Sequence, residues 1–306
     1  MNILYAFAEI RTPFLDKLVQ IVTRLGEEVL IIGFFVLIYW CINKRLAYVI
    51  GFGYFISGLT IQTLKITFRI DRPWILDPAF KPVESAVPAA TGYSFPSGHT
   101  NCATAFYGGM GLGSKKTAAK LLWFIPPIAV GFSRMYLGVH TPLDVGVSFL
   151  LTLVIIILSN WFFERLEGKR CFNLAVMLIV LALSAATLVC SFIVYSKGII
   201  EIKYVTDCCK AAGAAIGFGI GFYVERTRIN FDTRCDKAWK QLVKFVIGLA
   251  GALALQEGLK PIIGTSAVAG AVRYALVMLW IFLLYPLIIK RFFQSKETKE
   301  ADIQSV

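Results

Sequence analysis

Two histidines are the only imidazole groups in this 306-residue chain, and each lies in a short polar segment of an otherwise apolar sequence. His99 ends a Pro-Ser-Gly-His segment, and His140 lies between Arg134 and Asp144. A phosphate held by nearby cations can be attacked by one imidazole while the other protonates its leaving group. The residue types therefore point to phosphoryl transfer.

His140 and Asp144 are four residues apart, which places them on one face of a helix or close together in a turn. A carboxylate that accepts a hydrogen bond from one imidazole nitrogen fixes the tautomer and aims the other nitrogen. We therefore predict His140 as the nucleophile and Asp144 as the residue that orients it. Pro142 and Asp144 also suit the start of a helix, and the two interpretations are compatible.

The Pro-Ser-Gly-His segment lies where a polar loop meets an apolar run. Glycine permits close backbone approach, and the first turn of a helix presents free N–H groups to an anion. The segment predicts Ser97 and Gly98 as phosphate-binding residues and His99 as the general acid. The alternative is a simple helix start, with Ser97 as its cap and His99 exposed.

Lys65, Arg72 and Arg134 supply permanent positive charge. A guanidinium binds phosphate through two hydrogen bonds and stabilises the charge of the transition state. Lys65 and Arg134 lie at the ends of apolar runs. A charged side chain at such a position can also serve only to reach the membrane interface, which is the alternative explanation for these two residues. Arg72 precedes Pro73 in a loop and has no such explanation. We predict all three as phosphate-binding residues.

Two other kinds of site use similar residues. Two histidines and an aspartate are common metal ligands, but three cations nearby would repel a divalent ion, so we expect no metal and no cofactor. A Ser97–His–Asp hydrolase would leave the three cations without a purpose. The seven cysteines do not have the spacing of a zinc site, and we expect them to act as small apolar residues that pack between helices.

The composition is that of an integral membrane protein. Hydrophobic residues make up 57% of the chain, charged residues only 16%, and the mean hydropathy is +0.70. Soluble proteins carry about 25% charged residues. The net charge of +12 is spread in short clusters between apolar runs, so nucleic acid is not an expected partner.

The apolar runs predict an all-α polytopic membrane bundle. Residues 14–25 place apolar side chains on one helical face and polar side chains largely on the other, which predicts an amphipathic helix. Such a helix fits the membrane interface or the edge of the bundle. The expected spans are 27–42, 46–65, 97–113, 121–136, 143–163, 171–196, 205–224, 241–259 and 267–289. We divide the chain into an interfacial helix (1–26), a six-helix phosphatase core (27–196) and a C-terminal region of about three further spans and a short cytoplasmic tail (197–306).

Lysine and arginine are distributed unequally between alternate loops. Five segments contain 17 of them: 43–45, 114–120, 164–170, 225–240 and 290–299. The alternate segments contain 11: 1–28, 65–98, 134–142, 197–203 and 260–266. Because basic loops stay in the cytoplasm, the N-terminus is predicted outside and the C-terminus inside. All three polar motifs then fall on the extracytoplasmic face of the cell membrane.

Taken together, Lys-(six residues)-Arg-Pro, Pro-Ser-Gly-His and Ser-Arg-(five)-His-(three)-Asp resemble the three-part signature of the type-2 phosphatidic acid phosphatase / vanadium haloperoxidase superfamily. The resemblance covers residues 46–160. It implies an all-helical core, a metal-free extracytoplasmic site and a phosphohistidine intermediate. It gives the same roles to the residues: His140 nucleophile, His99 acid, Asp144 partner, and phosphate-binding Lys65, Arg72, Ser97, Gly98 and Arg134.

The expected function is hydrolysis of a lipid phosphate or diphosphate, with membrane lipids as surroundings and substrate. Candidates are undecaprenyl diphosphate, phosphatidate and phosphatidylglycerol phosphate. A lipid phosphotransferase and a glucose-6-phosphatase-like sugar phosphatase would use the same site. A lipid transporter or scaffold on a degenerate core is the non-enzymatic alternative.

The C-terminal region lies beyond the signature. Five ionisable residues of this region lie in or beside apolar runs: Asp207, Lys210, Glu257, Lys260 and Arg273. We predict that they pair with one another structurally. The alternatives are that they line a substrate portal or form a second site. Gly213, Gly217 and Gly221 repeat every four residues, which favours close helix packing within the chain and also allows a homodimer.

Overall fold

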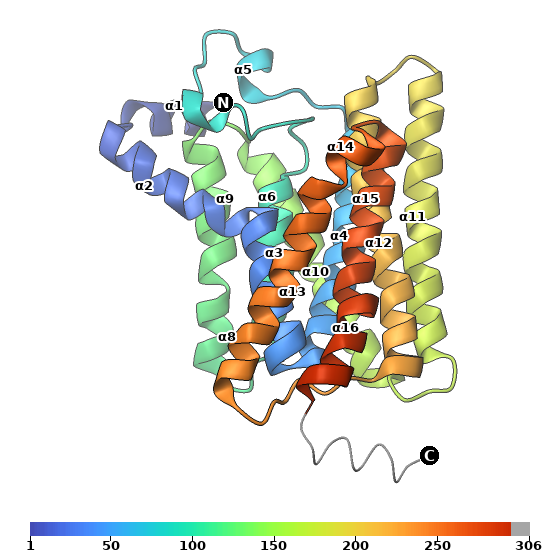
Figure 1. Cartoon of the computed structure of the whole chain (residues 1–306). Helices are drawn as coiled ribbons and strands as arrows, with labels where there is room; N and C mark the ends of the chain where they lie inside the picture. Colours follow the sequence, from blue (N-terminus) through green and yellow to red (C-terminus); the bar gives the residue numbers. More distant parts are fainter. Residues whose placement is uncertain (295–306) are drawn as a thin grey trace.

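The computed structural model describes residues 1–294. Within that part the chain is helical and has no β-strand, and helical runs alternate in direction between the two ends of a bundle (Figure 1). In chain order the runs are α3 (Glu28–Leu37) with η2 (Ile38–Ile42), α4 (Lys44–Phe68), α6 (Gly98–Ala103) with η4 (Thr104–Gly108) and α7 (Gly109–Gly113), α8 (Thr117–Trp123) with α9 (Ile125–Tyr136), α10 (Pro142–Leu166), α11 (Phe172–Ser196), α12 (Ile202–Val224) with η5 (Glu225–Ile229), α13 (Ala238–Gly258) with α14 (Lys260–Ile263), and α15 (Ala267–Leu279) with η6 (Trp280–Leu284), α16 (Tyr285–Ile288) and η7 (Ile289–Phe293).

Each of the nine predicted spans coincides with one of these runs, and the all-α membrane bundle is confirmed. Five helical segments within residues 1–294 are long and apolar enough to cross a membrane: Lys44–Leu76, Pro142–Leu166, Phe172–Ser196, Ala238–Ile263 and Ala267–Phe293. A sixth results if Pro13–Gly26 and Glu28–Ile42, bent by 49°, form one span. The runs α6–α7, α8–α9 and α12 do not meet that measure, so their crossing stays a prediction.

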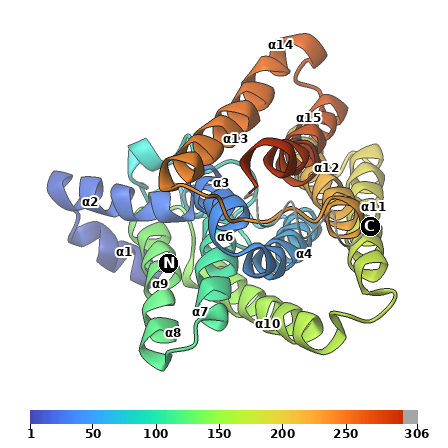
Figure 2. The same ribbon diagram turned by 60° about the horizontal axis from the view of Figure 1, so that its bottom comes forward.

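The segment predicted as one interfacial helix forms two, α1 (Asn2–Glu9) and α2 (Pro13–Thr23), followed by the short η1 (Arg24–Gly26). Thr12 is extended and Pro13 starts the second helix, because proline suits the first helical position but has no N–H to continue an earlier one. Figures 1 and 2 show α2 extending sideways from the bundle. The Tyr136 hydroxyl donates to Asp16 Oδ1 at 2.9 Å, whereas Phe14 is 74% exposed. Helix α2 therefore packs Leu15 and Val19, together with Asp16, on the protein and exposes Phe14, Leu18 and Ile21.

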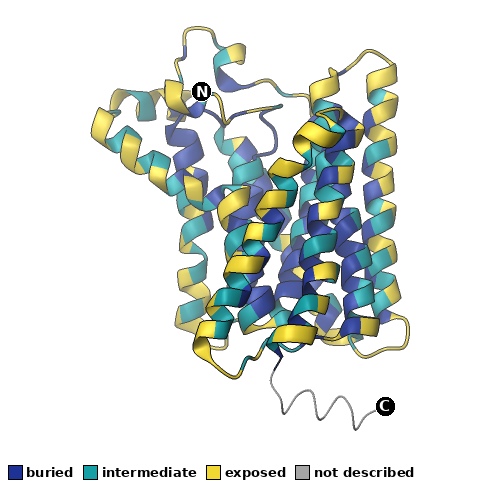
Figure 3. Cartoon of the chain, viewed as in Figure 1, coloured by how far each residue is buried: buried dark blue, intermediate teal, exposed yellow. Residues whose placement is uncertain are grey.

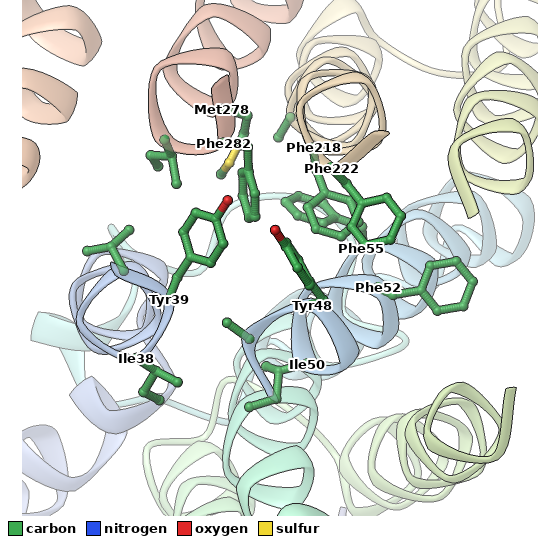
Figure 4. Packing of buried hydrophobic residues seen from close by; sticks show 14 of the residues in the cluster. Ile38, Tyr39, Tyr48, Ile50, Phe52, Phe55, Phe218, Phe222, Met278 and Phe282 are labelled. Carbon is green, nitrogen blue, oxygen red and sulfur yellow. The ribbon is translucent and has the colours of Figure 1, made fainter. Parts of the chain in front are cut away.

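The centre of the bundle is an aromatic layer built from both halves of the sequence (Figure 4). Tyr39 and Phe282 lie with ring centroids 4.6 Å apart, and Phe218 lies 4.9 Å from Phe282. Phe55 of α4 stacks on Phe218 at 4.8 Å. Helices α12 and α15 of the C-terminal region therefore share one core with α3 and α4.

Helices α12 and α15 approach closely along the predicted glycine stripe. A Cβ atom on Gly213 would lie 2.0 Å from the Ala271 carbonyl oxygen, and one on Gly217 would lie 2.5 Å from the Ala275 carbonyl oxygen. Only a residue without a side chain allows this separation. The prediction that the stripe packs within the chain is confirmed.

One end of the bundle gathers the three polar motifs. The C-terminal end of α4, the N-terminal ends of α6 and α10 and the C-terminal end of α9 all lie there, capped by the loop with α5 (Pro73–Leu76) and η3 (Glu84–Ala86) (Figure 1). The segments that begin α4, α8, α11 and α13 lie at the opposite end. Figure 3 shows exposed residues along the outer faces of α11 and α13, which in a membrane bundle face lipid.

Candidate active site

A cavity of about 470 Å³ opens where the three motifs meet. Of the eight predicted site residues, six line it: Lys65, Arg72, Gly98, His99, Arg134 and His140. Asp144 lies behind His140, in contact with its ring. Ser97 is fully buried and does not line the cavity. The structure thus brings together residues that lie up to 75 positions apart in the sequence.

The His140 ring is held between Arg72 on one side and Asp144 with Ser94 on the other, and the Ser94 hydroxyl lies 3.4 Å from Nδ1. Its Nδ1 lies 3.5 Å from Asp144 Oδ2, and its Nε2 lies 2.9 Å from an Arg72 guanidinium nitrogen. A guanidinium can only donate, so Nε2 must be the unprotonated nitrogen and Nδ1 carries the proton toward Asp144. The lone pair of Nε2 therefore points at Arg72 on the cationic side of the cavity, and a bound phosphate must take over this Arg72 donor before Nε2 can attack.

Asp144 is oriented by the start of α10. Its Oδ2 accepts hydrogen bonds from the Thr141 backbone N–H at 2.7 Å and from the Ser94 hydroxyl at 2.6 Å. The Thr141 side chain in turn accepts from the Asp144 N–H, which completes a capping box. The same carboxylate begins the helix and faces the His140 ring, so the helix start is confirmed and the orienting role of Asp144 stays a prediction.

Arg72 is fixed by backbone carbonyl groups. Its guanidinium donates to the carbonyl oxygens of Thr91, Gly92 and Val139 at 2.7 to 3.0 Å, besides the bond to His140. Four of its five N–H groups are therefore engaged, and one is free for a ligand. Three carbonyl bonds hold the guanidinium beside the predicted nucleophile without neutralising its charge.

Lys65 and Arg134 keep more of their donors free. Lys65 donates one hydrogen bond, to the Tyr93 carbonyl oxygen at 2.6 Å. Arg134 is 1% exposed and donates to the Thr23 hydroxyl at 3.1 Å, while its Nε has no hydrogen-bond partner within residues 1–294. A buried guanidinium with unused N–H groups is costly unless an anion binds it. This pair supplies the donors that a phosphate needs.

The first turn of α6 lies at the cavity wall. The Ser97 hydroxyl accepts from the Thr100 N–H at 3.4 Å and from the Thr100 hydroxyl at 3.0 Å, so Ser97 caps the helix. Gly98 and His99 follow it and line the cavity. The alternative of a capped helix start is thus correct for Ser97, while His99 lies in the cavity wall.

The electrostatics of the cavity favour an anion. Burial, and then the charges of Arg72, Arg134 and Lys65, hold the pKa of His140 well below its usual value. The ring is therefore neutral and nucleophilic across the physiological pH range. The same three cations disfavour a divalent metal, and no group of three His, Cys, Asp or Glu side chains converges within residues 1–294.

Several residues of the site carry no recognisable sequence signal. Thr23 and Ser94 are ordinary polar residues in short segments, and each contacts a predicted site residue. Ser94 adjoins the Pro-Ser-Gly-His segment, which is the one hint the sequence offers. The C-terminal region adds Asp207 and Lys210 to the cavity wall, joined by an ion pair of 3.1 Å. Their pairing with each other agrees with the structural prediction, and their position in the cavity goes beyond it.

The other ionisable residues of the C-terminal region lie elsewhere. Glu257 and Lys260 are exposed near the end of α13 and the start of α14. Arg273 is 7% exposed, and two of its nitrogens have no hydrogen-bond partner within the described residues. Its guanidinium lies 5.9 Å from the centre of the Tyr274 ring, and it forms no ion pair within residues 1–294.

Comparison with known proteins agrees with the motifs. A family model described as the PAP2 superfamily matches residues 45–168, and one described as PAP2 superfamily phosphatase, transmembrane extension, matches residues 209–297. Phosphatidylglycerophosphatase B of Bacillus subtilis (strain 168) is 27% identical over 181 residues, which cover 53% of this chain and 81% of the relative.

Among solved structures, a transmembrane PAP2-type phosphatidylglycerolphosphate phosphatase from Bacillus subtilis is similar. It is 25% identical, with a TM-score of 0.47, over 55% of this chain and 86% of that chain. The two family models lie on either side of α11 and together span α4–α10 and most of α12–α16. The chain therefore belongs to the PAP2 superfamily, as a membrane phosphatase that carries the family's transmembrane extension.

Proposed function

We propose that the protein hydrolyses a lipid phosphate or diphosphate through a phosphohistidine on His140. The observation that carries this proposal is the Nε2 atom of His140, which is unprotonated and lies among Lys65, Arg72 and Arg134. No metal or cofactor is part of the proposed reaction, since the three cations supply the positive charge that a phosphoryl transfer needs. The similarity to phosphatidylglycerophosphatase B, whose name specifies a lipid phosphate, supports a lipid substrate.

In the first step the Nε2 lone pair attacks phosphorus and the bond from phosphorus to the leaving oxygen breaks. Asp144 stabilises the imidazolium that forms, because its carboxylate faces the Nδ1 proton. His99 donates a proton to the leaving oxygen, and the negative charge of the bound phosphate favours its protonated form. Lys65, Arg72, Arg134 and the Gly98 backbone hold the phosphate oxygens.

In the second step water attacks the phosphohistidine. His99, now neutral, accepts a proton from the water while the bond between phosphorus and Nε2 breaks. Free phosphate leaves and both histidines return to their initial state. Transfer to a lipid hydroxyl in place of water would make a phosphotransferase by the same chemistry.

The proposed location is the extracytoplasmic face of the cell membrane. Its support is the excess of lysine and arginine in the segments at the end of the bundle away from the cavity. The substrate would then be a lipid of the outer leaflet, with its phosphate at the level of α6 and its apolar part toward the bilayer. Candidates are phosphatidylglycerol phosphate, phosphatidate and undecaprenyl diphosphate.

The experiment is a phosphate-release assay on the purified protein in detergent, with EDTA and short-chain versions of these lipids. Rapid quenching at alkaline pH with ³²P-labelled substrate should trap label on the protein, because phosphohistidine is stable to base. His140→Ala should trap none, and Glu257→Gln, an exposed residue away from the cavity, should trap as much as wild type. Release that needs added metal, or faster turnover of glucose 6-phosphate than of any lipid, would contradict the proposal.

A further inference from the structure

The cavity is longer than a phosphate site requires. Along α4 its wall runs from Lys65 to Tyr54, eleven residues or about 16 Å of helix. The opposite wall comes from the C-terminal region, through Tyr204 to Ala214 on α12 and Tyr274 and Met278 on α15. At about 470 Å³ the cavity is within the range of small-molecule sites. The space beyond the phosphate-binding residues is where the leaving group would lie.

The part of this space next to the phosphate site is polar. It contains charges of both signs, whereas the phosphate-binding residues are cationic. Asp207 and Lys210 form an ion pair of 3.1 Å, and Glu28 at the start of α3 interacts electrostatically with both. Asp207 lies beside Gly92, whose carbonyl group holds Arg72. Gln62, almost one turn of α4 before Lys65, adds an amide to the same wall. None of these four side chains has a part in the proposed phosphoryl transfer.

Further along, the wall is apolar. Gly58 and Leu59 on α4, Ala211 and Ala214 on α12, and Met278 on α15 line this part. Small side chains leave room for a hydrocarbon segment, and these five residues carry no charge. The cavity therefore changes from cationic to mixed polar to apolar along its length.

We propose that Glu28, Gln62, Asp207 and Lys210 form a subsite for the leaving group, and that it selects an amphiphile with hydroxyl groups next to the scissile phosphate. A hydroxyl both donates and accepts, so it can satisfy a carboxylate together with the ammonium or the amide. A second phosphate has no donor for Glu28 and Asp207 and would be repelled by them. A hydroxylated lipid monophosphate is thus preferred over a diphosphate. This inference rests on the proposed lipid phosphatase activity.

The test compares ratios of kcat/KM among three short-chain substrates: lysophosphatidate, which has a glycerol hydroxyl beside its only phosphate, phosphatidate, which has none, and farnesyl diphosphate. Wild type should prefer the first. Asp207→Asn and Glu28→Gln should each lower the preference for the first substrate over phosphatidate about tenfold, the loss of one hydrogen bond to a charged group. Both should raise the relative rate on the diphosphate, because a repelling charge is removed.

Glu257→Gln on α13 is the matched control, since it removes a carboxylate that does not line the cavity. Thermal unfolding identifies a variant that fails to fold, and the other of the two variants then decides. Unchanged ratios in a folded variant of an active enzyme, or a wild-type preference for the diphosphate, would overturn the subsite while leaving the lipid phosphatase intact. If wild type hydrolyses neither these three lipids nor phosphatidylglycerol phosphate, the proposed function itself fails.

Discussion

The ring of Tyr204 on α12 lies parallel to the ring of Tyr93, with centroids 4.1 Å apart and an interplanar angle of 8°. The carbonyl group of Tyr93 accepts the hydrogen bond from Lys65, and that of the preceding Gly92 accepts one from Arg72. This aromatic contact therefore connects the C-terminal region to the backbone that positions two cations of the site.

Tyr204→Ala should lower kcat/KM for a short-chain lipid phosphate about tenfold, since the loss of stacking frees the segment that holds Lys65 and Arg72. Vanadate, which mimics the pentavalent phosphate, should bind more weakly by a similar factor. Tyr204→Phe keeps the ring and should restore both values. Tyr195→Ala, an exposed tyrosine of α11, is the control. Normal vanadate affinity in Tyr204→Ala would argue against a positioning role.

The proposed role of His99 predicts a dependence on the leaving group. His99→Ala should slow hydrolysis of a lipid phosphate about 10² to 10⁴-fold, because an alkoxide leaves poorly without a proton. With p-nitrophenyl phosphate the loss should be much smaller, since that leaving group needs little protonation. Steady-state kinetics on both substrates measures the difference. Equal losses would remove His99 from the role of acid.

The pKa of His140 gives a prediction for NMR. Because the pKa is lowered in the folded protein, the ring should stay neutral at pH 5.5 in the absence of phosphate, with its proton on Nδ1. The chain has two histidines, so ¹⁵N-histidine labelling in micelles resolves each ring, and His99→Ala assigns them. Arg72→Met removes one of the charges that lower the pKa and should raise it. A charged His140 ring at pH 6.5 in wild type would contradict the arrangement.

The same shift has a consequence for stability, with a definite sign. Between the lowered pKa of the folded state and the ordinary value near 6.5, the unfolded chain binds a proton on this histidine and the folded chain does not. Acidification below pH 6.5 should therefore destabilise wild type relative to His140→Gln. Thermal unfolding of both proteins at pH 7.5 and pH 5.5 measures this difference.

The α12–α15 contact predicts a stability difference between two glycines. Gly213→Ala places a Cβ 2.0 Å from the Ala271 carbonyl oxygen and should cost about 1–3 kcal/mol, because two helix backbones must separate. Gly258→Ala on α13 meets nothing within 4 Å and should be neutral or stabilising. Thermal unfolding in detergent compares them. A neutral Gly213→Ala would show that the helices are not in this close contact.

The sequence by itself identified a membrane phosphatase and its helical runs, and it named the residues that the structure brings together at one cavity. The charge and shape of the side chains of His99, His140 and the three cations follow from their residue types. Within each motif these residues lie a few positions apart, so the motifs are recognisable in the sequence. The nine helical runs within residues 1–294 follow from apolar runs with polar ends, because a backbone in lipid must satisfy its own hydrogen bonds. The glycine stripe on α12 likewise indicated a close helix contact before any partner was known.

Only the tertiary structure decided which groups hold these residues. Arg72 is fixed by three backbone carbonyl groups, which every residue type offers equally, so no sequence pattern marks them. Arg134 meets Thr23, 111 positions away, and the orientation of Asp144 depends on Ser94. The cavity wall contributed by Asp207 arises because α12, which packs closely on α15, also packs against α4. Contacts between distant helices depend on how whole faces pack, and that information is not local.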